Sequence, residues 1–155
     1  MMDRSDVVDT VRDLIDTCRD GEKGFQEAAD HAKRPDLKSM FLEVSRQRAE
    51  FARTLESELA SLAPEKNEKH EGHVVGALHR AWIDTKTALG AGDQAILEWL
   101  EQGEDYAKGK YEKALSTGLP APLLSTVRNQ AQSVISTHDR VRAMRDAKAN
   151  LTKSD

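Results

Sequence analysis

Apolar residues recur near the start of the chain at alternating steps of four and three, which is the spacing of a helix with one buried stripe. This stripe consists of Val7, Val11, Leu14, Cys18, Gly21, Phe25, Ala28 and Ala32. A flanking lane one residue later is apolar except at Glu22, which therefore points at the interior or its margin. The pattern predicts a helix over about residues 3–33, capped by Asp3 or Ser5 and stopped before Pro35.

The same spacing predicts long helices over about residues 36–62, 93–116 and 121–149, and a shorter helix over about 73–89. Asp93 is the expected cap of the helix that it begins. Short connections make neighbouring long helices antiparallel, whereas the long connection that holds the short helix must cross the length of the bundle. We therefore expect one all-α domain with a ferritin-like up-down four-helix topology.

Each long helix carries a polar residue on or beside its buried stripe. Glu22, Arg48, Glu104 and His138 lie roughly ten to twelve residues from helix ends that share one end of the bundle, so a rise of about 1.5 Å per residue places them in one layer. Burying unpaired carboxylates costs several kcal/mol each. We expect Arg48, with His138 and Gln47, to neutralise Glu22 and Glu104 in a buried polar cluster.

A metal site is the alternative interpretation of this layer. Ferritin-like bundles hold two iron or manganese ions with one Glu from each of two helices and Glu-x-x-His from each of the other two. Glu22, Glu104 and His138 would be ligands, and Glu43 or Glu101 could join them after helix rotation. The sequence contains no Glu-x-x-His motif. We therefore expect no cofactor, with iron or manganese as the alternative.

The remaining candidate residues favour structural roles. Cys18 is the single cysteine and lies on a buried stripe, so it is expected to be a small core residue, with a reactive thiol as the alternative. His70 and His73 have a spacing that zinc could use, but without a third nearby ligand they indicate a solvated loop. Trp82 is expected to anchor the crossover helix, with a partner contact as the alternative. No pattern of a covalent nucleophile stands out.

The composition limits which partners the protein is expected to bind and where in the cell it is expected to lie. Charged residues make up 32% and aromatic residues 5% of the 155 residues, a balance that favours amphipathic helices. A net charge of -4 gives no general attraction to nucleic acid or anionic membrane. No apolar stretch approaches the roughly 20 residues of a membrane span, and the acidic start has no apolar signal core. We expect a cytoplasmic protein.

Five segments together resemble a bacterial family of four-helix-bundle proteins in the ferritin-like clan that carries only a domain-of-unknown-function label. They are TCRDGEKGFQEAADH, DLKSMFLEVSRQRAEFARTLESEL, VVGALHRAWIDTKTAL, EQGEDYAKGKYEKAL and HDRVRAMRDA. The resemblance implies a ferritin-like bundle with a crossover helix in bacterial cytoplasm, and it supplies no substrate, ligand or catalytic residue.

Two function classes follow from these patterns. The first is a non-enzymatic bundle, either stress-linked or a self-associating scaffold, with Trp99 and Tyr106 available for a homo-oligomer contact. The second is a metal-dependent oxidase or iron-handling protein. Arg48, a cation in the layer where metal would lie, favours the first class.

Overall fold

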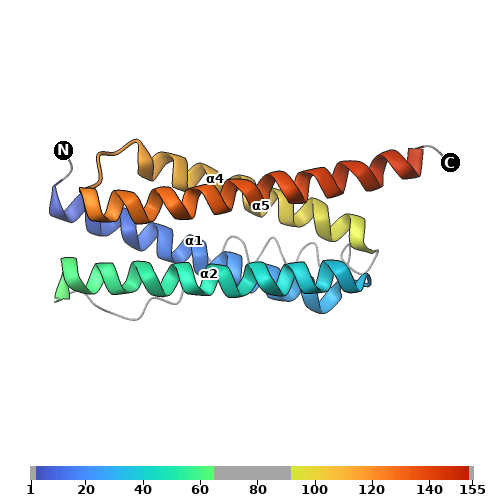
Figure 1. Cartoon of the computed structure of the whole chain (residues 1–155), viewed down its shortest axis with the longest axis horizontal. Coiled ribbons are helices and arrows are strands. Elements are labelled where there is room, and N and C mark those ends of the chain that lie inside the picture. The colour runs from blue at the N-terminus through green and yellow to red at the C-terminus, as the bar shows by residue number, and fades with distance from the viewer. Residues whose placement is uncertain (1–2, 65–91, 154–155) are drawn as a thin grey trace.

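The computed structural model describes residues 3–64 and 92–153, which contain four long helices (Figure 1). The helices are α1 (Arg4–His31), α2 (Pro35–Leu62), α4 (Asp93–Leu115) and α5 (Ala121–Lys153). Within these two segments there is no strand, as the all-α prediction requires. The predicted crossover helix over 73–89, with Trp82, and the histidines at 70 and 73 lie outside the described residues.

The helix ends show which local signals the chain uses. Asp3 caps α1, because its carboxylate accepts a hydrogen bond of 2.9 Å from the backbone N–H of Asp6. Asp93 was expected to cap α4, but it is the first helical residue and Gly92 stands at the cap position. Its carboxylate instead accepts hydrogen bonds from the backbone N–H groups of Lys33 (2.8 Å) and Arg34 (3.2 Å). Asp93 therefore ties the start of α4 to the turn between α1 and α2.

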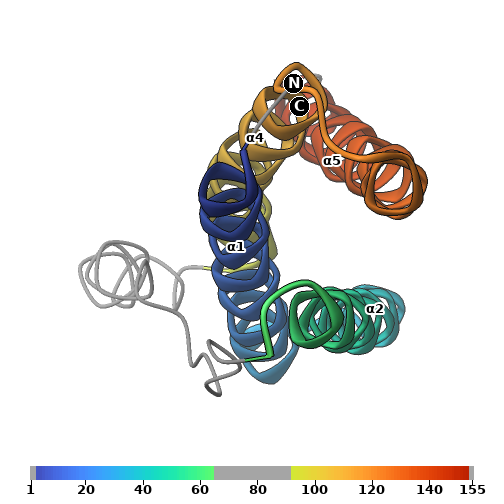
Figure 2. The same cartoon turned by 90° about the vertical axis from the view of Figure 1, so that its left-hand side faces the viewer.

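The helices alternate in direction in the way that the predicted connections require. In Figure 1, α1 and α5 run one way along the long axis, and α2 and α4 run the other way. Figure 2 shows α1 beside both α2 and α4, with α5 next to α4 and on the same side of the α1–α4 pair as α2. The pairs α1 and α2, α4 and α5, and α1 and α4 pack closely, whereas the backbones of α2 and α5 lie farther apart and are joined by side chains. Gln130 on α5 donates to the backbone carbonyl of Phe51, and Thr126 on α5 donates to Glu58. No helix in the described segments combines the length and apolar character that a membrane span needs.

Two apolar clusters fill the interior, one toward each end of the bundle. Leu14, Leu55 and Val134 are members of the first, which also contains the ring of Tyr111. The second cluster is built around Phe25, Phe41, Ile96 and Val141.

A charged layer separates the two clusters, because each helix passes from one cluster to the other through a polar or small residue. Arg48 lies between Val44 and Ala52 on α2, and Glu104 lies between Leu100 and Ala107 on α4. Charge at mid-bundle was the prediction from the sequence pattern, and the helix packing places Arg48 and Glu104 there.

Candidate functional site

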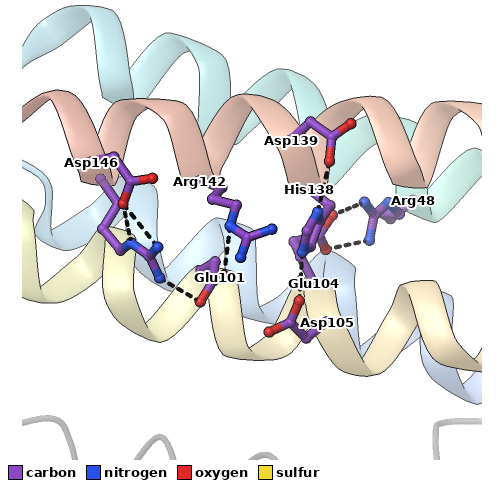
Figure 3. A network of polar contacts seen from close by, with 9 residues as sticks. Arg48, Glu101, Glu104, Asp105, His138, Asp139, Arg142 and Asp146 are labelled. Atoms are coloured by element: carbon purple, nitrogen blue, oxygen red, sulfur yellow. Dashed lines mark hydrogen bonds and ion pairs between the residues drawn. The ribbon is translucent and has the colours of Figure 1, made fainter.

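Arg48 and Glu104 form the centre of the charged layer (Figure 3). The two terminal nitrogens of the Arg48 guanidinium donate hydrogen bonds to the two carboxylate oxygens of Glu104, at 2.8 and 2.6 Å. Arg48 is 1% exposed and Glu104 is 2% exposed. The pair therefore makes the bidentate geometry that best satisfies a carboxylate, and it does so almost without solvent.

Two residues on α1, Phe25 and Gly21, accommodate the Arg48 guanidinium. Its central carbon lies 5.6 Å from the centre of the Phe25 ring, within the range of a cation–π attraction. A Cβ atom added at Gly21 would lie 3.0 Å from a terminal nitrogen of Arg48, so this glycine leaves room for the charge. Burial disfavours the charged form, but the attraction and hydrogen bonds of Glu104 outweigh it and raise the pKa of Arg48 above its ordinary value. The arginine stays charged.

The other three residues of the predicted cluster do not bond to Arg48 or Glu104. Glu22 accepts a hydrogen bond of 2.9 Å from Arg19, at the margin of α1, because one residue of helical rotation turns it away from the Gly21 position. Gln47 lines a polar groove of about 330 Å³ between α2 and α5. His138 is buried in the layer but bonds to other acids than Glu22 and Glu104. Only Arg48 and Glu104 of the five pair with each other.

His138 lies between two carboxylates on the α4 and α5 side of the layer. Its Nε2 atom pairs with Asp105 at 2.5 Å and its Nδ1 atom pairs with Asp139 at 2.9 Å (Figure 3). Burial lowers the pKa of the imidazole, but the bonds to Asp139 and Asp105 overcome this and raise the pKa of His138 above its ordinary value. These partners favour the imidazolium over a neutral metal ligand.

One group among the described residues could hold a single metal ion. Ligand atoms of Glu101, Asp105 and His138 all lie within 4.8 Å of one another. Glu101 already pairs with Arg145 at 2.8 Å, and Arg142 lies 3.9 Å from its other oxygen. A metal ion would have to displace one arginine and the proton on the histidine.

The residues at mid-bundle do not fit a pair of metal ions. Arg48 holds both oxygens of Glu104, and Glu22 is engaged at the margin of α1 with Arg19. Glu22, Glu104 and His138, the ligands that the alternative prediction named, therefore each have a different partner.

A second polar chain lies beside the ion pair, within the first apolar cluster. The Cys18 thiol lies 2.9 Å from the Tyr111 hydroxyl, which donates a hydrogen bond of 2.7 Å to the side-chain oxygen of Gln130. Gln130 in turn donates to the backbone carbonyl of Phe51 at 3.3 Å. Burial raises the pKa of Cys18 to about 11. The thiol is therefore unreactive at neutral pH, in line with the core role predicted for it.

The sequence pattern did not predict that Asp20, or the two acids that bond to His138, belong to the site. Asp20 is 6% exposed although no apolar lane of the heptad pattern passes through it. Asp105 and Asp139 are each exposed and resemble ordinary surface acids in the sequence. The sequence offers one signal for Asp20. It follows Asp16 by four residues, so both acids lie on one face of the helix, and Asp16 is buried as well.

The glycines around the layer give a prediction on stability. Gly21→Ala is expected to lose stability although alanine favours helix by about 1 kcal/mol, because the new methyl group would push on a guanidinium that Glu104 holds in place. At Gly103 and Gly109 on α4, an added Cβ atom meets nothing within 4 Å. Gly103→Ala and Gly109→Ala are therefore expected to gain about 1 kcal/mol each in urea unfolding. If Gly21→Ala gained as much stability as the two variants on α4, Gly21 would not be packed closely against Arg48.

A comparison with known families matches a model described as a domain of unknown function, DUF2383, over residues 6–117. The chain belongs to the DUF2383 family. The matched part contains α1 from its third residue onward and all of α2 and α4. It therefore includes Arg48, Glu104, Cys18 and Tyr111 of this DUF2383 chain. It ends before α5, so His138 lies outside it. No curated protein matches the sequence.

Proposed function

We propose that this protein is a non-enzymatic helical bundle of the ferritin-like type, in which a charged layer replaces a di-metal site. The observation that carries the proposal is the bidentate pair of Arg48 and Glu104, both almost fully buried at mid-bundle. A guanidinium supplies a fixed positive charge and five donors without redox chemistry or open coordination positions. The layer is therefore suited to holding the helices in register.

Metal content tests the proposal directly. Protein stripped with a chelator, reloaded with iron(II) or manganese(II) and desalted is expected to retain no tightly held pair of ions by elemental analysis. If the wild type retains one ion weakly and His138→Ala retains none, that ion is bound by Glu101, Asp105 and His138. Two tightly held ions per chain, lost in Glu104→Ala, would overturn the proposal.

We further propose that the bundle acts as a self-associating scaffold. Among the described residues, Leu42 and Tyr106 are the large apolar side chains that are exposed, at 38% and 36%. Trp99, the other aromatic residue considered for such a contact, is buried against α1. Tyr106 on α4 is therefore the aromatic side chain available to a second copy, which would gain from covering it. A stress-linked role stays a prediction.

Light scattering coupled to size-exclusion chromatography tests the scaffold role. The wild type is expected to elute with a mass above the 17.2 kDa of one chain, and Tyr106→Glu is expected to shift the mass toward that value. Ser125→Glu, which adds the same charge at an exposed position of α5, is the matched control. A monomeric wild type at the highest attainable concentration would contradict self-association.

A further inference from the structure

A small cavity lies between α1 and α4, next to the charged layer. Its volume is about 30 Å³, which is room for about two water-sized groups. The lining is mostly apolar and includes the aromatic residues Phe25, Trp99 and Tyr106. Asp20 and Thr17 on α1 are its polar lining residues beside Arg48 and Glu104, and the Thr17 hydroxyl already donates to the backbone carbonyl of Asp13 at 2.8 Å. The cavity thus combines aromatic surface with a carboxylate.

The Asp20 carboxylate is buried without a partner. Both of its oxygens are shielded from solvent, and neither accepts a hydrogen bond. An unpaired acid in such surroundings costs several kcal/mol. The cavity that it lines is therefore the place where a hydrogen-bond donor would be stabilised.

The charges around the cavity leave a net negative charge on its wall. Arg48 and Glu104 also line the cavity, but they neutralise each other through two hydrogen bonds. Asp16 and Lys23 act on Asp20 with opposite signs, since Asp16 raises its pKa and Lys23 lowers it. A cation would therefore be favoured in the cavity over a neutral or anionic group.

The chemistry of the lining selects the kind of cation. Calcium and magnesium ions need about six to eight oxygen ligands, whereas this lining offers the Asp20 carboxylate and the Thr17 hydroxyl. An ammonium group has three donors, which can serve both oxygens of Asp20, and aromatic faces attract it. We propose that this cavity binds a small primary ammonium group, with Asp20 as its counter-ion and the rings of Trp99, Phe25 and Tyr106 around it.

Methylammonium, which has two heavy atoms, is the probe that fits the cavity volume. NMR of ¹³C-labelled methylammonium chloride with the full chain at pH 8 and constant ionic strength is expected to show saturable binding. Asp20→Asn is expected to weaken this binding about tenfold or more, because a hydrogen bond to a charged group is lost. Asp30→Asn, at an exposed position of the same helix, is the matched control and is expected to bind like the wild type.

Two measurements on the wild type keep the test independent of how the variant folds. Binding is expected to strengthen from pH 6 to pH 8, since Asp20 loses its proton over this range while methylammonium keeps its charge. Tetramethylammonium, too large for the cavity, is expected not to bind. Equal binding of tetramethylammonium or potassium, undiminished binding by a folded Asp20→Asn variant, or no saturable binding at all would overturn the proposal.

Discussion

Arg48→Met is expected to destabilise the protein by about 3 to 5 kcal/mol, because it leaves the Glu104 carboxylate buried without its partner. The wild-type carboxylate has both oxygens bonded to one guanidinium and is 2% exposed, so solvent cannot replace what the arginine supplies. Urea unfolding followed by circular dichroism measures the loss.

The double variant Arg48→Met, Glu104→Leu separates the cost of an orphaned charge from the loss of a favourable pair. Apolar residues of similar volume often replace a buried ion pair without loss, so we expect the double variant to recover most of the stability. Arg34→Met is the matched control, since Arg34 makes the same kind of two-bond pair with Asp36 at an exposed site. Its effect is expected to stay within about 0.5 kcal/mol. If Arg48→Met also lost no more than about 0.5 kcal/mol of stability, the Glu104 carboxylate would have found another partner.

Asp20→Asn is expected to change how stability depends on pH. Burial, with a contribution from Asp16, raises the pKa of Asp20 from 3.8 to about 7. Between these two values the folded protein keeps a proton that the unfolded chain has released, so rising pH favours unfolding. The variant has no such proton. Its stability relative to the wild type is therefore expected to rise by roughly 2 to 4 kcal/mol from pH 4 to pH 8.

Urea unfolding at several pH values, in buffers without ammonium ions, measures this difference. Asp30→Asn removes a carboxylate from an exposed position of the same helix and is expected to follow the wild-type curve. Parallel curves for Asp20→Asn and the wild type would mean that the Asp20 carboxylate is solvated in the folded protein, and they would contradict its burial.

The candidate site was only partly open to prediction from the sequence. Arg48 and Glu104 could be found because each is a polar residue in an apolar lane, and heptad spacing fixes which lane faces the interior. Glu22 belongs to a lane at the edge of the stripe, where a small helix rotation decides between interior and margin. His138 is buried, but its partners come from α4 and from its own helix, at positions where the sequence pattern indicates exposure to solvent.

The sequence by itself determined the four long helices and the level at which charge enters the bundle, because both depend on the period of the helix and on distances counted along it. It also determined that the thiol of Cys18 would be in the core. The tertiary structure alone decided which charged groups meet. Pairing depends on the rotation of each helix and on the separation between helices. The approach of α1 to α4 is so close that a Cβ atom added at Gly24 would lie 3.1 Å from the Trp99 ring, whereas the backbones of α2 and α5 lie farther apart. For the same reason only the packed helices reveal the buried carboxylate of Asp20 and the cavity beside it.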